Sequence, residues 1–271
     1  MSLATAIDSR GIARVTLARP EIHNAFDDTL IAALTETLVR LGADSAVRAV
    51  VLTGKGRSFS AGADLNWMRR MADYGEAENL ADAGALARLM EVLDTLPKPT
   101  LALVNGAAYG GGVGLVACCD IAIAAENAAF CLSEVKLGLI PAVISPYVVS
   151  AIGARAARRY FLTAEAFPAA QALALGLVHE VVPAADLAAA GERVLDTLRL
   201  GGPEAQAEAK ALIALVTRPQ APDFAPQAAD RLRADLMVET GRRIARRRAS
   251  AEGREGLDAF LSKRRPAWIA E

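Results

Sequence analysis

The sequence contains few cysteines and few histidines. Its 271 residues include three cysteines, Cys118, Cys119 and Cys131, and two histidines, His23 and His179. An odd number of cysteines with two of them adjacent does not suit a disulfide framework, so we expect reduced thiols and a cytoplasmic location. The cysteine spacing is not that of zinc ligands, and we expect no metal site. The GxSxG turn of many serine hydrolases is also missing.

The chain has no excess of charge of either sign. Its formal net charge is −1, which argues against nucleic-acid binding through a general basic field. Arginines do cluster locally, and such clusters form either solvated helix faces or anion-binding surfaces. A coenzyme phosphate would suit such a surface as well as RNA. The clusters are Arg155, Arg158 and Arg159, and then Arg242, Arg243, Arg246, Arg247 and Arg248.

Long uninterrupted apolar runs are missing as well. No run reaches membrane-spanning length without a charge or a glycine cluster, and the start of the sequence lacks the regions of a signal peptide. Hydrophobic residues nevertheless make up 53% of the chain and charged residues 23%, which excludes a disordered protein. The length suits one large domain, or one domain with an appendage.

Short apolar runs alternate with helical patterns in the first part of the chain. Continuous apolar strands separated by helices are typical of a mainly parallel sheet covered on both faces. We therefore predict an α/β fold. The expected strands are residues 11–18, 46–53, 100–104, 121–125 and 129–132, and the expected helices are residues 28–41 and 78–96.

After about residue 200 the pattern changes to helices without strands between them, at residues 203–215, 230–248 and 251–264. We therefore expect residues 1–200 to form the core with the active site and residues 201–271 to form a C-terminal helical region. The pattern alone allows two roles for this region, packing between subunits or capping of its own subunit.

Two loops rich in small residues follow strands. Residues 59–65 read FSAGADL, and small residues there let a ligand approach the backbone closely. Asp64 suits the N-cap of a following helix. Residues 105–115 read NGAAYGGGVGL, where glycines open an apolar helix and leave N–H groups and the helix dipole for an anion. The second loop matches neither a Walker loop nor the dinucleotide GxGxxG pattern.

A single carboxylate, Glu134, lies between two apolar segments. Partial desolvation would raise its pKa toward the range useful for proton transfer. It could equally cap a helix or pair with Lys136. Taken together, the three segments predict two loops that offer backbone N–H groups to a developing oxyanion, with one carboxylate beside them.

These residues, in this order, resemble the enoyl-CoA hydratase/isomerase (crotonase) superfamily along nearly the whole chain. The resemblance implies a spiral of ββα turns, with C-terminal helices that form trimers, usually stacked into hexamers. It also implies an acyl-CoA thioester as substrate, no prosthetic group and no membrane. The matching segments are residues 19–20, 24–25, 60–64, 105–112, 119–120, 133–134, 138–141, 174–178 and 255–266.

The resemblance further implies roles for particular residues. The backbone N–H groups of Ala63 and Gly111 would form the oxyanion hole, and Glu134 would be the acid–base group. The implied contacts of coenzyme A are His23, Ala25, Ala61 and Asp64, joined by Phe260 and Lys263 from a neighbouring subunit.

The sequence departs from the family pattern at one position. Typical hydratases carry a second glutamate on the glycine-rich helix, where this chain has Gly114. Residues 59–69, 118–120, 130–134 and 141–146 nevertheless resemble the branch that hydrates 3-methylglutaconyl-CoA or isohexenylglutaconyl-CoA, in leucine and acyclic-terpene breakdown. This similarity favours a hydratase without the first glutamate.

The carboxylate of a glutaconyl-type substrate could itself replace the missing base. Gly114 would then leave room for it, and Arg69 and Arg70 are candidate clamps because guanidinium groups match carboxylate geometry. Both arginines could instead be surface residues of a helix. Trp67 is a candidate for the wall of the acyl pocket, although ordinary apolar packing would also explain it.

Three other functions are compatible with parts of the pattern. An enoyl-CoA isomerase needs only one glutamate to move a proton between C2 and C4. RNA binding is a second possibility, which the local arginines favour and the net charge disfavours. The third is an inert assembly scaffold, against which the presence of Glu134, Ala63 and Gly111 argues.

Overall fold

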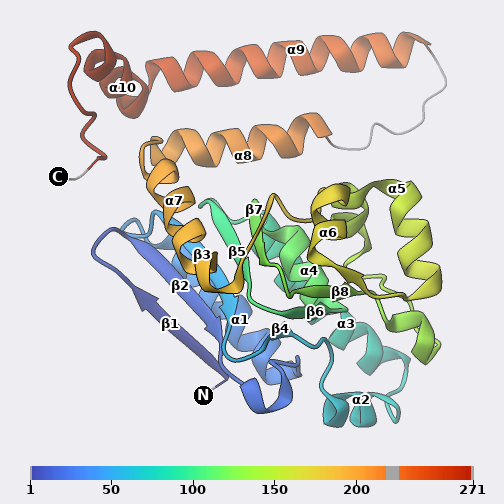
Figure 1. Ribbon diagram of the computed structural model, residues 1–271. Coiled ribbons are helices and arrows are strands. Elements are labelled where there is room, and N and C mark those ends of the chain that lie inside the picture. The colour runs from blue at the N-terminus through green and yellow to red at the C-terminus, as the bar shows by residue number, and fades with distance from the viewer. Residues whose placement is uncertain (1, 218–225, 270–271) are drawn as a thin grey trace. The chain divides into compact units, whose positions relative to one another are not determined.

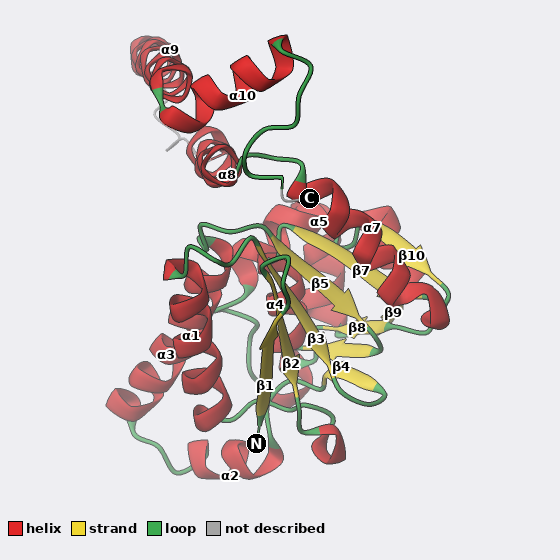
Figure 2. Cartoon of the chain, turned by 90° about the vertical axis from the view of Figure 1, so that its left-hand side faces the viewer, coloured by secondary structure: helices red, strands yellow, loops and turns green. Residues whose placement is uncertain are grey.

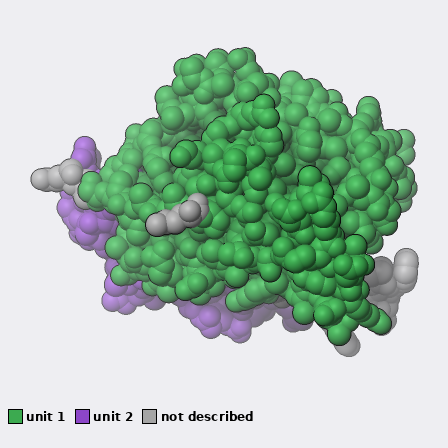
Figure 3. Space-filling model, turned by 90° about the horizontal axis from the view of Figure 1, so that it is seen from below, with its two compact units in different colours: residues 1–196 green, residues 197–271 purple. Residues whose placement is uncertain are grey.

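The computed structural model describes residues 2–217 and 226–269, and the side chains of residues 226–234 lie outside the description. The chain divides into two compact units, residues 1–196 and residues 197–271 (Figure 3). The first unit contains both sheets, and the second is helical.

A six-stranded sheet runs through the first unit in the order β1-β2-β3-β5-β7-β10 (Figure 1). Its first pair is antiparallel, and all the other pairs are parallel. Every residue of β5 is buried, as the apolar runs predicted for strands covered on both faces. The strands are β1 (Leu3–Ile7), β2 (Ile12–Leu17), β3 (Ala49–Gly54), β5 (Thr100–Val104), β7 (Ile121–Ala125) and β10 (Glu180–Val182).

A second sheet of four very short strands has the order β4-β6-β8-β9. Its first three strands are parallel, and β9 is antiparallel to β8. Each parallel strand closely follows a strand of the large sheet, so the pairs β3–β4, β5–β6 and β7–β8 repeat one ββ unit before the chain turns into a helix. The strands are β4 (Ser58–Ser60), β6 (Ala107–Tyr109), β8 (Ala129–Cys131) and β9 (Phe167–Pro168).

Helices connect the ββ repeats. Helices α1 and α3 lie side by side against the large sheet (Figure 2). Helix α1 begins where Asp27 accepts a hydrogen bond from the N–H of Leu30 at 2.8 Å, and it buries a leucine-rich stripe at helical spacing. The helices are α1 (Asp28–Ala43), α2 (Leu65–Met71), α3 (Glu76–Asp94), α4 (Gly111–Cys118), α5 (Ser145–Thr163), α6 (Ala169–Leu175) and α7 (Leu187–Arg199), with short 3₁₀ turns at Pro20–Ile22, Glu134–Leu137 and Ala184–Asp186.

Helix α4 is buried on nearly all sides, which confirms the buried helix predicted after the glycine-rich loop. Only Gly111 and Ala117 among its residues are partly accessible. A helix that is apolar all round belongs inside a core. The first turn of α4 therefore lies in the interior of the first unit. Any ligand that meets this turn meets it in a largely desolvated place.

The second unit contains the three helices predicted for the C-terminal region, α8 (Pro203–Thr217), α9 (Pro226–Ala249) and α10 (Ala251–Leu261). The carboxylate of Glu252 accepts hydrogen bonds from the N–H groups of Glu204 and Ala205, at 2.8 and 2.7 Å, and so caps α8 from the start of α10. That this unit joins subunits stays a prediction. No helix in the described ranges has the length and apolarity needed to span a bilayer.

Candidate active site

The loop after β4 is fixed by hydrogen bonds that leave one N–H group free. The N–H of Ala61 donates to the carbonyl oxygen of His23 at 2.9 Å, and that of Asp64 donates to Phe26 at 2.7 Å. Gly62 donates to the side-chain oxygen of Ser60 at 3.3 Å. Within the described part of the chain, the N–H of Ala63 has no such partner. The loop therefore presents this group to a ligand.

The second loop presents another N–H group at the start of α4. Gly110 has a positive φ of 49° and donates its own N–H to Cys131 at 2.9 Å. Gly111 then opens the helix, where the first N–H groups have no intrahelical acceptor. Among described residues, nothing accepts from the N–H of Gly111. The helix dipole adds to its attraction for negative charge.

The two loops lie against each other. A Cβ built on Gly62 would be 3.0 Å from the carbonyl oxygen of Tyr109. The backbone of Phe26 forms an isolated parallel β-bridge with Ala63. The ring of Phe26 lies 3.2 Å from the point where a Cβ on Gly111 would be. The structure thus brings together Ala63 and Gly111, the two donors predicted from the sequence, and contact this close leaves no room for larger side chains at these glycines.

The carboxylate of Glu134 lies beside the same loops. Its Oε1 atom is 3.2 Å from the position of a Cβ on Gly110. Its Oε2 atom is buried, with no hydrogen-bond partner in the described chain. Burial raises the pKa of Glu134 above its usual value, against a smaller opposite effect of a backbone hydrogen bond. Such a carboxyl keeps its proton to a higher pH than an exposed glutamate does.

The residues expected around coenzyme A belong to the same loops. His23 and Asn24 both have φ of 56°, a left-handed turn that brings Ala25 and Phe26 to the first loop. His23 Nε2 accepts a hydrogen bond from Arg57 at 3.0 Å, which leaves Nδ1 as the donor to Ser58 at 2.9 Å. The contact of this turn with coenzyme A stays a prediction.

Asp64 caps the helix that follows the first loop, as predicted. Its Oδ1 atom accepts hydrogen bonds from the N–H groups of Asn66 and Trp67, at 2.9 and 3.0 Å. Ala61, at the other end of the loop, is exposed. The cap ties the direction of α2 to the loop that carries Ala63.

The three pocket residues predicted on α2 take different places. Trp67 is buried in the hydrophobic core, and its Nε1 donates to Asp82 at 3.2 Å. Arg69 and Arg70 are exposed. Arg70 pairs with Asp28 at 2.8 Å, and Arg69 donates to a neighbouring asparagine. The interpretation of Trp67 as a packing residue is thus the one that its surroundings favour, and the clamp role of the arginines stays a prediction.

The room expected at Gly114 is not there. A Cβ at this position would overlap Cγ2 of Ile144 and would lie 3.1 Å from Cε of Met90. Both of these side chains are buried. The expectation that a substrate carboxylate occupies this space is therefore wrong, because two apolar side chains fill it. Ile144 follows Glu134 by ten residues, and only the folded structure sets it against α4.

Phe260 and Lys263, expected to reach a neighbouring subunit, belong to the second unit. Phe260 is 82% exposed at the end of α10, and Lys263 has a φ of 55° in the turn after that helix. Their proposed contact with coenzyme A is not tested within one chain.

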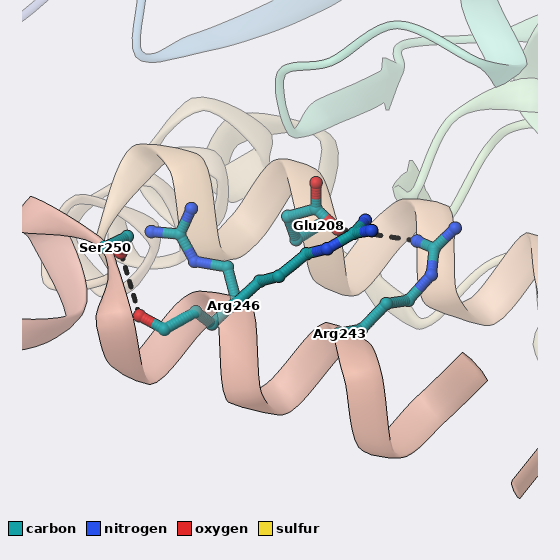
Figure 4. A pocket seen from close by; sticks show the side chains of 5 residues that line it. Glu208, Arg243, Arg246 and Ser250 are labelled. Carbon is teal, nitrogen blue, oxygen red and sulfur yellow. Dashed lines mark hydrogen bonds and ion pairs between the residues drawn. The ribbon is translucent and has the colours of Figure 1, made fainter. Parts of the chain in front are cut away.

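Four of the eight arginines in the two predicted clusters pair with acidic side chains of the described residues. On α9, Arg243 pairs with Glu208 and Glu239, and Arg247 pairs with Glu204 and Glu252. Glu208 and Ser250 line a pocket of about 280 Å³ together with three arginines of α9. Figure 4 shows Glu208 beside Arg243 in this pocket. Glutamates thus offset the positive charge of α9, which favours an ion-paired helix face over an anion site. On α5, Arg159 pairs with Glu165.

Three residues of this site were given no role from the sequence, although Ser60 and Ile144 stand in segments that carry the family resemblance. Phe26 spaces the two loops, Ser60 holds Gly62, and Ile144 covers Gly114. The three cysteines are buried thiols, as expected of small core side chains. The described residues contain no group of three or more potential metal ligands.

Comparison with known proteins identifies the family. The family model described as enoyl-CoA hydratase/isomerase matches residues 8–271. An enoyl-CoA hydratase from Shewanella pealeana is 46% identical, with a TM-score of 0.91 over 99% of this chain and 96% of that one. AtuE from Pseudomonas aeruginosa is 36% identical, with a TM-score of 0.91 over both whole chains. The enoyl-CoA hydratase AFT6-1 of Alternaria alternata is 39% identical over 76% of this chain and 67% of its own. The predicted crotonase-like α/β fold is confirmed, and this chain belongs to the enoyl-CoA hydratase/isomerase family.

Proposed function

We propose that the chain is an enoyl-CoA hydratase that adds water across the double bond of a 2-enoyl-CoA thioester. The observation that carries this proposal is one arrangement, the unpartnered N–H groups of Ala63 and Gly111 beside a buried carboxyl of Glu134 with a free oxygen. Donors of this kind stabilise charge on a carbonyl oxygen, and the carboxyl moves a proton next to it.

In the proposed reaction the thioester oxygen accepts hydrogen bonds from Ala63 and Gly111. Water adds at C3, electrons shift through C2 to that oxygen, and negative charge develops there. Preorganised donors are worth most at this stage, because losing one such donor typically costs about 3 kcal/mol of transition-state stabilisation. The helix dipole of α4 acts on the same oxygen.

Glu134 then completes the addition. A proton must leave the attacking water, and a proton must arrive at C2. The raised pKa of Glu134 lets the carboxyl donate to C2 and recover a proton from the water within one cycle. Because Ile144 occupies the place of a second carboxylate, Glu134 carries both transfers unless the substrate assists.

For the substrate we propose 3-methylglutaconyl-CoA or a longer glutaconyl-CoA. This rests on the resemblance of residues 59–69 and 141–146 to that branch. The substrate carboxylate cannot lie at Gly114, so it must approach the water from another side. Arg69 and Arg70 stay the candidate clamps, since Arg70 could exchange its exposed pair with Asp28 for the substrate.

The assembly and location follow as part of the same proposal. We propose a homotrimer or a hexamer in the cytoplasm, with Phe260 and Lys263 reaching the coenzyme A of a neighbouring subunit. His23, Ala25 and Ala61 would contact the coenzyme within one subunit.

An enoyl-CoA isomerase is the second candidate, favoured by the apolar filling at Gly114 that leaves one glutamate. The test is to incubate the protein with 3-methylglutaconyl-CoA in deuterated water and to identify the product by mass spectrometry and NMR. A 3-hydroxy thioester with one deuterium at C2 supports the hydratase. Deuterium at C2 and C4 with no hydroxy product overturns it in favour of the isomerase.

A further inference from the structure

Two glycines at the start of α4, the N-cap Gly110 and Gly114, have groups from elsewhere in the chain at the places of their missing side chains. A Cβ on Gly110 would meet Oε1 of Glu134, and a Cβ on Gly114 would meet Ile144. Within the helix itself, Gly111 and Gly114 are three positions apart and therefore share one face. The carboxylate of Glu134 therefore lies just before the helix, and the aliphatic side chain of Ile144 lies on the face that begins at Gly111.

The spacing places Ile144 close to the reacting carbons. Three residues of a helix rise about 4.5 Å, so Ile144 covers a position within one turn of the N–H donor Gly111. In the proposed function the thioester oxygen lies at Gly111, and Glu134 reaches C2 or the water at C3. A substituent on C3 that points along α4 therefore meets the side chain that covers Gly114.

That surface is apolar and firmly held. Ile144 is 2% exposed, and Met90, which also meets the Gly114 position, is fully buried. A Cβ at residue 114 would overlap Cγ2 of Ile144. No side chain therefore fits at residue 114 unless Ile144 moves. Apolar surface of this kind favours a methyl or alkyl group and disfavours a charged one.

We propose that Ile144 is the specificity-determining residue of this site, which excludes a second carboxylate from α4 and offers an apolar wall to a branch on C3 of the enoyl thioester. The substrate class is then a 3-branched enoyl-CoA. This inference rests on the proposed function, because it takes the thioester to lie between Gly111 and Glu134.

The test compares two thioesters that differ by one methyl group, 3-methylglutaconyl-CoA and glutaconyl-CoA. One methyl group in a fitted apolar pocket is worth roughly tenfold or more in kcat/KM. We expect the wild type to prefer the branched substrate by about that factor, and Ile144→Ala to lose the preference. Ile152→Ala, another buried isoleucine shortened on α5, is the matched control and should keep it. An unchanged preference in an active Ile144→Ala protein overturns the inference.

A binding measurement separates this inference from the proposed reaction. Calorimetry with isovaleryl-CoA and butyryl-CoA, which differ by the same methyl group and do not react, should show the preference in the wild type and its loss in Ile144→Ala. If the wild type hydrates neither substrate but shows this pattern, the proposed function fails and the inference about Ile144 is supported. Equal affinities of the wild type for the two thioesters would overturn the inference that Ile144 contacts the branch on C3.

The seating of Ile144 on Gly114 has its own test, which keeps the inference falsifiable if Ile144→Ala folds poorly. Gly114→Ala should lower the urea midpoint of unfolding, and adding Ile144→Gly should restore part of that loss by removing the overlapping methyl group. Purely additive effects in the double variant would overturn the contact on which the inference depends.

Discussion

The hydroxyl of Ser60 accepts a hydrogen bond from the backbone N–H of Gly62 at 3.3 Å. The same hydroxyl donates to the carbonyl oxygen of Asn24 at 2.9 Å, and Ser60 is fully buried. One side chain thus links the turn at residues 23–25 to the loop that presents Ala63. It holds the oxyanion donor in place without touching the substrate.

Ser60→Ala should therefore weaken both stability and turnover. Two buried backbone groups lose their partner, which costs about 1–3 kcal/mol for each unsatisfied group. Because the donor of Ala63 then loses its support, kcat should fall while KM changes little. Urea unfolding and steady-state kinetics check this, with the exposed Ser150→Ala as control. A kcat equal to that of the wild type would show that Ser60 does not position the loop.

Gly62→Ala should separate backbone strain from contact between the loops. Gly62 has a φ of 85° and meets Tyr109, while Gly153 has a φ of 74° and open space around its Cβ position. Both alanine variants should lose about 1–2 kcal/mol of stability from the left-handed conformation. Only Gly62→Ala should also lower kcat, because its methyl group pushes the second loop away. Equal kcat values in the two variants, measured on folded protein, would contradict the close packing of the loops.

The free energy of unfolding of Glu134→Gln should increase relative to that of the wild type as the pH rises. Burial holds the pKa of Glu134 above its ordinary value of 4.5, so the folded state favours the protonated carboxyl. The stability that this carboxyl contributes is complete below the ordinary value and is lost as the pH rises through the raised one. The amide does not titrate, so the gain of the variant over the wild type should grow across that window.

Urea unfolding at a series of pH values from below 4.5 upward measures this difference. Glu36→Gln, on the exposed side of α1, controls for the removal of one negative charge. A difference between wild type and Glu134→Gln that is constant with pH would mean that the carboxyl is as well solvated in the folded protein as in the unfolded one.

The central strands of the large sheet were predictable because each is a nearly continuous apolar run of five or six residues. The expected strands at residues 100–104 and 121–125 coincide with β5 and β7, and α1 follows its leucine spacing. In the second sheet only β8 was predicted, within the expected strand at residues 129–132. The other strands are two or three residues long, too short for any periodicity to appear. The edge strand β1 is mostly exposed and has no apolar pattern.

The candidate site also contains residues that the sequence predicts and one contact that only the folded structure reveals. Ala63, Gly111 and Glu134 stand in recognisable segments, so the sequence could predict them together. The structure brings these segments side by side, and their roles stay a prediction. The covering of Gly114 by Ile144 depends on how the segment after Glu134 packs on α4, and thirty positions separate the two residues in the chain. A glycine in the sequence means either open space or a close neighbour, and only tertiary packing distinguishes the two.

The central claim is that Glu134 alone carries the proton transfers beside the Ala63 and Gly111 donors. The most direct test is the kcat of Glu134→Gln on 3-methylglutaconyl-CoA, together with its affinity for isovaleryl-CoA. We expect kcat to fall by a factor of about 100 to 10,000, the usual contribution of a positioned acid–base group, while the affinity stays within about twofold. Retention of kcat within about threefold, with binding intact, would contradict the claim and place the acid–base group elsewhere.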